Sequence, residues 1–361
     1  MKIAQVCPNY YPYIGGVEIA VEEISRRLVK RGIETTVLTT DPSGLLQREE
    51  IIDQVVVRRF KSWAPGEAFY FSSDLKNHLR KNSKEYDIVH AHSYAAFPAL
   101  YAAQAKNEAR LVFNPHYHGT GHTFLRRILH LPYRLLGRRI FKAADKLVFV
   151  SQYEKNLASR HFKIDVEKST VIPNGLNLEE FMNLKHSKKQ STNNGTRELL
   201  FVGRLEEYKG VQYIMKALPQ LEQGTSLSVV GKGPFKKNLI QLATKLNIAD
   251  RLTFYQDLPR EELLQKYADA DVFILLSKRE AYGISVAEAL CAKTPCIVAN
   301  TSALTEWIDG ENCFGIDYPI NITRLVGLID SVCGRRANRS GILDWDEVAE
   351  RLVAVYKSIN D

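Results

Sequence analysis

Two carboxylates and a glycine turn stand close together late in the chain, from Glu280 to Glu288. Gly283, Ile284 and Ser285 lie between them, and Ser285 is a candidate N-cap that would place Glu288 in the first turn of the next helix. Free amides at a helix start can hold phosphate oxygens, and ionised carboxylates accept hydrogen bonds from hydroxyl groups. The segment therefore predicts a site for a phosphorylated sugar; two solvated acids are the alternative.

Two cations stand on one short loop earlier in the chain, within Gly203-Arg204 and Lys209-Gly210. The loop follows a predicted strand, so in a parallel sheet it lies at the carboxyl edge, where ligands bind. Arginine can contact a phosphate through two nitrogens and lysine supplies a point charge, a combination that suits a diphosphate. A solvated charged turn is the alternative.

Paired glycines, Gly15 and Gly16, follow the first predicted strand and open the first helix. They would let a ligand approach the backbone and the free amides of the helix start. A plain tight turn is the alternative. The pair is not the GxGxxG fingerprint of dinucleotide-binding enzymes, which counts against a nicotinamide-dependent enzyme.

The elements that position these loops alternate between strand and helix. The strand candidates are apolar with little polar alternation, which is typical of strands covered on both faces of a doubly wound parallel sheet. We expect strands at Lys2–Cys7, Glu34–Thr39, Val55–Phe60, Ile88–His90, Leu111–Asn114, Lys146–Ser151, Glu198–Gly203, Ser226–Gly231, Leu252–Tyr255, Val272–Leu276 and Cys296–Ala299, and a closing amphipathic helix over Trp345–Ile359.

The pattern restarts after a polar segment, Lys185–Arg197, which is typical of a linker. We therefore expect two Rossmann-like α/β domains, residues 1–172 and 173–361. The last helix, about 344–359, is expected to return to the first domain.

Composition sets broad limits on the function. The chain has 361 residues and a formal net charge of +8, which favours anionic partners without choosing among them. Its five cysteines are scattered, which is typical of reduced thiols in a cytoplasmic protein. No apolar run approaches the ~20 residues of a membrane span.

Taken together, these motifs resemble the family 4 retaining glycosyltransferases of GT-B fold, also called group 1. The resemblance extends over roughly residues 1–358. It is carried by Glu280-x7-Glu288 with the glycine and cation motifs above, and by weaker fragments in the same order: Asp87–His92, Val150-Ser151, Ile172–Gly175, Val230–Pro234 and Ala270–Val272.

The resemblance implies a GT-B enzyme with two domains facing each other across a cleft, which transfers a hexose from a nucleotide sugar with retention of configuration and without a metal. It implies that Gly15 and Gly16 approach the diphosphate and that Arg204 and Lys209 stabilise its developing charge. Glu280 would hold the sugar hydroxyls and Glu288 the ribose. Gly231 and Gly233 would frame the base.

Histidines follow a first-domain strand, where the family usually has a cleft histidine. Counted from the strand end, His116 is the better match for a catalytic residue and His118 is the alternative. Asn174 belongs to the acceptor side or the cleft in the same reading. His90 and His92 are expected to be structural or to line the cleft, because most histidines serve packing.

The sequence predicts no metal site. Asp269-Ala270-Asp271 matches a metal-binding DxD pattern but stands at a helix end before a buried strand. His116 and His118 lack a third ligand at a sensible spacing. We therefore expect no cofactor and no metal.

A basic segment, residues 123–142, is free of acids and interleaved with aliphatic and aromatic residues. We expect Pro132 to break it into two short helices. Such helices bind anionic membrane surfaces; a helix packed inward with solvated arginines outside is the alternative. The expected protein is cytoplasmic, with peripheral attachment to the inner membrane face as a hypothesis.

The expected substrates are a GDP- or UDP-sugar donor and a glycan or lipid-linked acceptor. A nucleotide-sugar epimerase and a non-catalytic nucleotide-sugar-binding protein are the alternatives. No nucleic-acid motif is present. Gln256 and Thr301–Thr305 depart from the family pattern by lacking its glycines, which leaves base choice and the rim of the donor pocket open.

Overall fold

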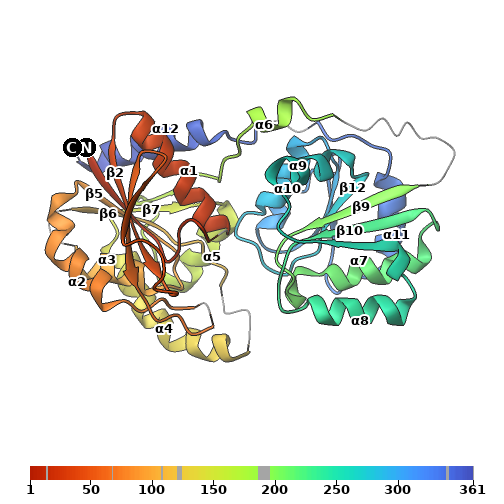
Figure 1. Ribbon diagram of the computed structural model, residues 1–361, viewed down its shortest axis with the longest axis horizontal. Coiled ribbons are helices and arrows are strands. Elements are labelled where there is room, and N and C mark those ends of the chain that lie inside the picture. The colour runs from red at the N-terminus through yellow and green to blue at the C-terminus, as the bar shows by residue number, and fades with distance from the viewer. Residues whose placement is uncertain are drawn as a thin grey trace. The chain divides into compact units, whose positions relative to one another are not determined.

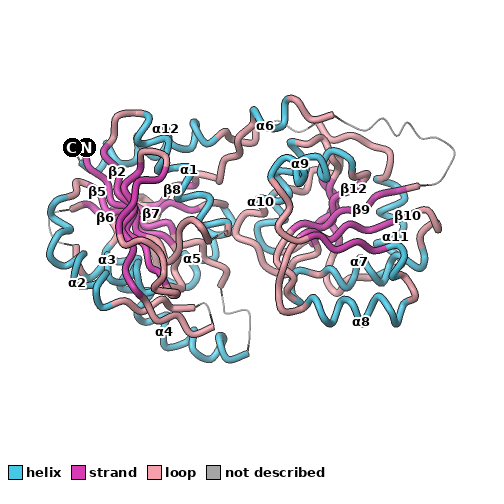
Figure 2. Tube along the Cα trace, viewed as in Figure 1, coloured by secondary structure: helices cyan, strands magenta, loops and turns pink. Residues whose placement is uncertain are grey.

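The computed structural model describes residues 1–13, 15–66, 68–106, 109–119, 124–185, 196–338 and 341–360, and for 124–132 the backbone alone. Most of the predicted linker lies outside these residues. The chain forms two compact α/β units, Met1–Gly175 with Leu343–Asp361, and Leu176–Ile342 (Figure 1). Each unit contains one largely parallel sheet (Figure 2). The predicted class of two Rossmann-like units is confirmed.

The first unit has an eight-stranded sheet in the order β3-β4-β2-β1-β5-β6-β7-β8. Neighbouring strands are parallel except β3, which pairs antiparallel with β4 at the edge. The strands are β1 Lys2–Val6, β2 Glu34–Asp41, β3 Glu49–Ile52, β4 Val55–Lys61, β5 Ile88–His92, β6 Arg110–Asn114, β7 Lys146–Phe149 and β8 Ser169–Val171. The helices are α1 Gly16–Lys30, α2 Ser73–Asn82, α3 Phe97–Gln104, α4 Phe124–Ala143, α5 Gln152–Phe162 and α12 Trp345–Asn360.

The last helix, α12, belongs to the first unit although it follows the second in sequence. Trp345, Val348, Leu352 and Tyr356 recur at helical spacing and are buried in a core with side chains of α1, β1 and β5. Four buried apolar side chains, each contributing up to about 1.5–3 kcal/mol, explain why the helix packs there.

Helix α4 corrects one prediction. It continues from Phe124 to Ala143 through Pro132 instead of breaking into two short helices. A proline removes one helical hydrogen bond, but tertiary packing can hold the helix together. The packing is visible in the second half, where Tyr133, Ile140 and Phe141 are buried and Gly137 lies against the ring of Tyr94.

The inward-packed alternative therefore describes the second half of α4. Arg138, Arg139 and Lys142 are exposed on its outer face. The side chains of Arg126 and Arg127 lie outside the described residues.

The second unit has a six-stranded parallel sheet in the order β11-β10-β9-β12-β13-β14. Its strands are β9 Arg197–Val202, β10 Thr225–Val230, β11 Leu252–Tyr255, β12 Val272–Leu275, β13 Cys296–Ala299 and β14 Cys313–Ile316. Its helices are α6 Glu179–Met182, α7 Val211–Ala217, α8 Lys236–Leu246, α9 Arg260–Asp269, α10 Ile284–Cys291 and α11 Ile322–Val332. All five cysteines of the chain are free thiols. Among the described helices, none is long and apolar enough to cross a membrane.

Candidate functional site

Lys209 and Glu280 meet at the centre of the second sheet's carboxyl edge. Lys209 ends a short turn after β9, and Glu280 lies on the loop after the neighbouring strand β12. The strands that follow β9 in sequence, β10 and β11, lie on one side of it, and β12 to β14 lie on the other side. The gap between the ends of β9 and β12 is therefore the topological switch point, where ligands of such sheets bind. The Lys209 ammonium donates to Glu280 Oε1 at 2.6 Å.

The pair is withdrawn from water, since the side chains of Lys209 and Glu280 are 15% and 13% exposed. Burial alone would lower the pKa of Lys209, but the charge of Glu280, with Tyr208, outweighs it and raises the pKa above the ordinary value. Lys209 is therefore a fixed positive charge. Glu280 Oε2 accepts no hydrogen bond from the described residues, which leaves it available to a ligand hydroxyl.

Arg204 lies on the same loop as Lys209 but is directed to a different partner. Its side chain is 63% exposed and lies 3.2 Å from the carboxylate of Glu206. An exposed pair of this kind is weak, about 0–1 kcal/mol.

Helix α10 begins beside Glu280, and its start corrects another prediction. The N-cap is Gly283, in the left-handed region at φ 96°, and Ser285 is already inside the helix. Glycine takes this backbone conformation without strain, which explains why the helix begins before the serine. Glu288 consequently falls in the second turn rather than the first.

Two backbone amides at the start of α10 are unengaged. The amides of Ile284 and Ser285 donate to no acceptor among the described residues, whereas those of Val286 and Ala287 bond to the Gly283 carbonyl. The helix dipole adds partial positive charge at this end. Lys209, the Glu280 carboxylate and two free amides thus lie on adjoining loops of one sheet edge.

The backbone of Glu280 is held by the segment after β13. The amide of Glu280 donates to Ser302 Oγ at 3.0 Å, and the Trp307 indole donates to the Tyr282 carbonyl at 2.7 Å. Ser302 opens a short 3₁₀ turn, Ser302–Glu306, where the family pattern has glycines. The serine in place of a glycine therefore supplies the hydroxyl group that holds the backbone of the Glu280 loop.

Glu288 is buried and fully engaged, a feature that the sequence pattern did not indicate. One carboxylate oxygen accepts from the Arg260 guanidinium and the other from the Tyr267 hydroxyl at 2.9 Å. Arg260 also bonds Glu180 at 2.8 Å. Each carboxylate oxygen retains a second lone pair, so the arrangement orients Glu288 while leaving room for a ribose hydroxyl.

Gly231 and Gly233 serve close packing between two loops. A Cβ on Gly231, at φ 140°, would lie 2.0 Å from the Gly203 carbonyl oxygen, and one on Gly233 would lie 2.4 Å from that of Leu205. The loops after β9 and β10 can approach only because both positions lack a side chain. Their predicted role in framing a base stays a prediction.

In the first unit, Gly15 and Gly16 also lie at a switch point, because β1 stands between β2 and β5. Gly15 is the N-cap of α1, with extended backbone, and no atom lies within 4 Å of a Cβ placed on Gly16. The amides of Gly16 and Val17 donate to no acceptor among the described residues. The Glu18 carboxylate lies close to Gly15, and the role of this turn in binding a diphosphate stays a prediction.

The loop after β6 carries His116, at φ 47° and half buried. Burial, and to a lesser extent His118, lowers the pKa of His116 to about 3, so the imidazole is neutral near pH 7. Its Nε2 has no hydrogen-bond partner among the described residues. His118 is half buried on the same loop, and Asn174 is half buried after β8.

His90 and His92 are fully buried on β5 and are structural, as expected. His90 Nδ1 lies 2.7 Å from the Tyr356 hydroxyl of α12, and His92 Nε2 lies 2.7 Å from Gln5 Oε1. The His92 ring stacks toward His116 with 5.9 Å between centroids. Through these contacts, His90 and His92 connect α12 to the loop that carries His116.

Both carboxylates of the DxD pattern accept hydrogen bonds from within the protein. Asp269 accepts from the side chain of Gln265 at 2.9 Å. Asp271, just before β12, accepts from the amide of Glu198 on the neighbouring strand β9 at 2.7 Å. Among the described residues, no group of three histidine, cysteine or carboxylate side chains could hold a metal ion.

Comparison with known proteins decides the family. The model described as Glycosyltransferase Family 4 matches residues 14–180, and the model described as Glycosyl transferases group 1 matches residues 183–339. The chain belongs to the family 4, group 1 glycosyltransferases. This glycosyltransferase is 26% identical to an uncharacterised glycosyltransferase of Methanocaldococcus jannaschii, over 99% of this chain and 98% of the relative.

Solved structures show that the glycosyltransferase has the GT-B fold. Sucrose-phosphate synthase of Thermosynechococcus elongatus superposes with a TM-score of 0.82 at 19% identity, covering 99% of each chain. The Anabaena protein HepE, in complex with UDP and glucose, superposes with a TM-score of 0.79 at 18% identity, over 99% of this chain and all of HepE.

Proposed function

We propose that this glycosyltransferase takes a hexose from a nucleotide sugar, retains its anomeric configuration and needs no metal ion. The main support is the Lys209–Glu280 pair at the switch point, beside the amides of Ile284 and Ser285, which have no acceptor among the residues that the structure describes. A site that offers fixed positive charge and a carboxylate suits a substrate whose one end is a diphosphate and whose other end is a sugar.

The reaction breaks the bond between the anomeric carbon and the diphosphate oxygen, and the bonding electrons leave with the diphosphate. Lys209, Arg204 and the α10 amides stabilise that growing negative charge, which is the electrostatic task otherwise given to a metal. The acceptor hydroxyl oxygen bonds to the anomeric carbon from the same face, and its proton passes to the departing phosphate oxygen.

Glu280 orients the donor sugar in this proposal. Its Oε1 is fixed by Lys209, so Oε2 points as an acceptor at the hydroxyls of the hexose. Glu288, already held by Arg260 and Tyr267, accepts from the ribose. His116, neutral near pH 7, contributes a hydrogen bond to the reacting sugars rather than a charge.

The donor is a UDP- or GDP-sugar, and the acceptor is a glycan or a lipid-linked sugar. Support for the nucleotide comes from HepE, whose structures contain UDP and UDP-glucose.

The test is a panel of UDP- and GDP-sugars assayed in EDTA for binding and nucleotide release, with wild type and Glu280→Gln. Binding of one donor, with metal-free release of its nucleotide that Glu280→Gln abolishes, supports the proposal. Turnover only with added Mn²⁺ or Mg²⁺ contradicts metal independence. Binding without release supports a non-catalytic binder, and conversion of the donor sugar without release supports an epimerase.

A further inference from the structure

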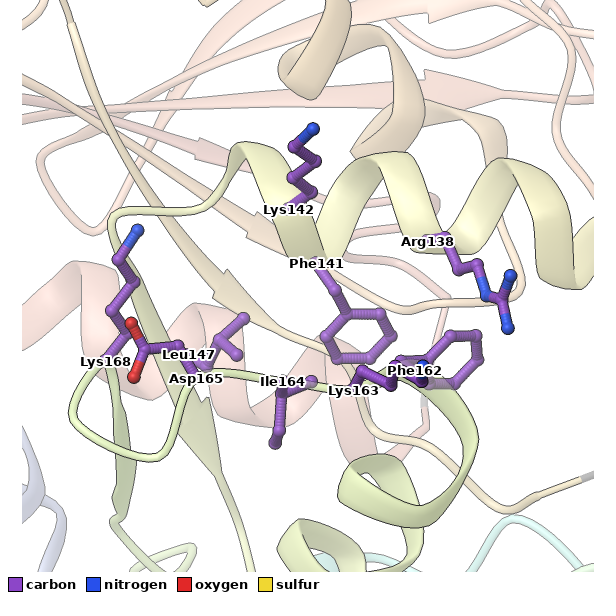
Figure 3. A pocket seen from close by; sticks show the side chains of 9 residues that line it. All are labelled: Arg138, Phe141, Lys142, Leu147, Phe162, Lys163, Ile164, Asp165 and Lys168. Atoms are coloured by element: carbon purple, nitrogen blue, oxygen red, sulfur yellow. The ribbon is translucent and has the colours of Figure 1, made fainter.

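The first unit contains a pocket of about 370 Å³ that shares no residue with the candidate functional site. It lies between the end of α4, the start of β7, the end of α5 and the segment that leads into β8 (Figure 3). The volume is that of small-molecule sites. Its lining residues are Arg138, Phe141, Lys142, Leu147, Phe162, Lys163, Ile164, Asp165 and Lys168.

The pocket is at the wrong edge of the sheet for the glycosyl transfer. Lys168 and Leu147 stand at the beginnings of β8 and β7, and the ends of α4 and α5 reach the same edge. Gly16 and His116 follow the ends of β1 and β6, at the opposite, carboxyl edge. A ligand in the pocket is therefore remote from the groups that act on donor and acceptor in this unit.

Four cations and one carboxylate line the pocket. Arg138, Lys142, Lys163 and Lys168 are exposed, and none makes a side-chain hydrogen bond or ion pair with another described residue. Asp165, the single acid, already accepts from the Glu167 amide at 3.0 Å. The net positive charge is thus uncompensated from within the described chain.

The helix dipole explains the positions of only two of the four cations. Lys142 lies in the last turn of α4 and Lys163 is the C-cap of α5, where cations offset the helix dipole. Arg138 lies more than a turn before the end of α4, and Lys168 belongs to no helix. Their presence around the same hollow needs another explanation, and an anionic ligand supplies it.

The inner wall of the pocket is apolar. Phe141 and Phe162 are buried and stack with 4.5 Å between ring centroids, and Leu147 and Ile164 continue the wall. Figure 3 shows Phe141 and Ile164 in the middle, with Lys142, Lys168 and Arg138 around them. Among the four apolar lining residues only Ile164 keeps appreciable accessible surface, which a bare phosphate ion would leave in water and the hydrocarbon chain of a phosphate ester would cover.

We propose that this pocket binds a phosphate ester that carries an apolar chain, with the four cations around the phosphate and the chain against Phe141 and Ile164. The ligand comes either from an anionic lipid surface or from a soluble phosphorylated amphiphile. The proposal is independent of the proposed donor chemistry, since the pocket shares no residue with that site.

The experiment measures binding of the whole protein to three probes. They are vesicles of equal parts phosphatidylglycerol and phosphatidylcholine, a short-chain phosphatidylglycerol below its micelle concentration, and glycerol phosphate. The double variant Lys142→Glu/Lys168→Glu should weaken binding of the short-chain lipid at least about tenfold. Each basic residue near an anionic group strengthens binding by a factor of roughly five to ten, and the variant removes two of them. Ile164→Gln should weaken it while leaving all four cations in place.

The matched control is Lys76→Glu/Lys81→Glu, which makes the same charge change at exposed positions of α2. Binding of the short-chain lipid that this control preserves and the pocket variants lose supports the proposal. If wild type also binds the vesicles and the pocket variants lose that binding in parallel, the membrane is the source. If wild type binds the short-chain lipid but not the vesicles, the source is a free amphiphile. Equal losses in pocket and control variants, no binding of the short-chain lipid, or equally tight binding of glycerol phosphate would overturn it.

Discussion

Lys209 Nζ lies 2.6 Å from Glu280 Oε1, although the two residues are 71 positions apart in the chain. Parallel strands β9 and β12 bring them together, because their carboxyl ends adjoin at the switch point of the second sheet. The contact places a retained positive charge beside a carboxylate that keeps one oxygen available. This is the chemical basis of the proposed transfer reaction.

Replacing Lys209 by methionine removes the buried charge while keeping an apolar stem of similar length. We expect kcat for sugar transfer to fall by about 10²–10³, the usual effect of losing one preorganised group that stabilises developing negative charge. Lys237→Met, at an exposed position of α8, is the control and should leave kcat unchanged. Equal kcat values for the two variants would remove Lys209 from the reaction.

The carboxylate of Glu288 depends on Arg260 for its compensating charge. Arg260→Met should lower the free energy of unfolding by about 1–3 kcal/mol, because a mostly buried carboxylate loses its charged partner. Adding Glu288→Gln should restore part of the loss, since the uncompensated charge disappears. Arg324→Met breaks an exposed pair with Asp317 and should cost less than about 1 kcal/mol. Urea titrations give the comparison, and equal costs for the two arginines would contradict it.

The imidazoles of His90 and His92, which are fully buried, and of His116, which is half buried, predict a pH dependence of stability. Burial lowers the pKa of His90 and His116 to about 3 and that of His92 well below its ordinary value. The unfolded chain, with histidine pKa values near 6.5, therefore binds more protons than the folded protein below that pH. Stability should fall as the pH drops from about 6.5 toward 3, by about 1.4 kcal/mol per pH unit for each histidine.

The measurement is the slope of unfolding free energy against pH, in wild type and in His92→Asn. The variant should show a shallower slope over the same window whatever its absolute stability. An unchanged slope would mean that His92 takes up a proton equally in the folded and unfolded states.

Gly231→Ala tests the close approach of the loops after β9 and β10. The added methyl group would meet the Gly203 carbonyl oxygen at a backbone angle that favours glycine, so we expect a clear fall in Tm. Gly327→Ala is the control, because it lies within α11 with no atom near the new methyl group, and it should be neutral or stabilising. A Tm for Gly231→Ala equal to wild type would show that the loops can move apart without cost.

The sequence predicted the sheets well where burial leaves a continuous apolar run, as in Val272–Leu275 and Cys296–Ala299. It missed β3, β8 and β14. The first is an antiparallel edge strand with two glutamates, and the others are only three and four residues long. Short edge strands carry little apolar signal, because one side of them is not covered.

Sequence patterns placed residues of the candidate site where their positions depend on local structure, and missed contacts that depend on tertiary packing. Glu280 and Lys209 stand on loops that directly follow recognisable strands. Arg260 and Tyr267 lie on α9 and reach Glu288 only through the tertiary packing of α9 against α10. The start of α10 was misplaced because serine is the commoner N-cap, whereas here the positive φ of Gly283 decides where the helix begins.

The most direct test of the account is a double-mutant cycle on kcat with Lys209→Met, Glu280→Gln and the two combined, assayed in EDTA with the donor that the panel identifies. If the two residues act as one unit, the double variant should be about as slow as the slower single variant, far from the product of the two effects. Fully multiplicative losses, or a double variant that transfers sugar at the wild-type rate, would contradict the claim that this pair is the reaction centre.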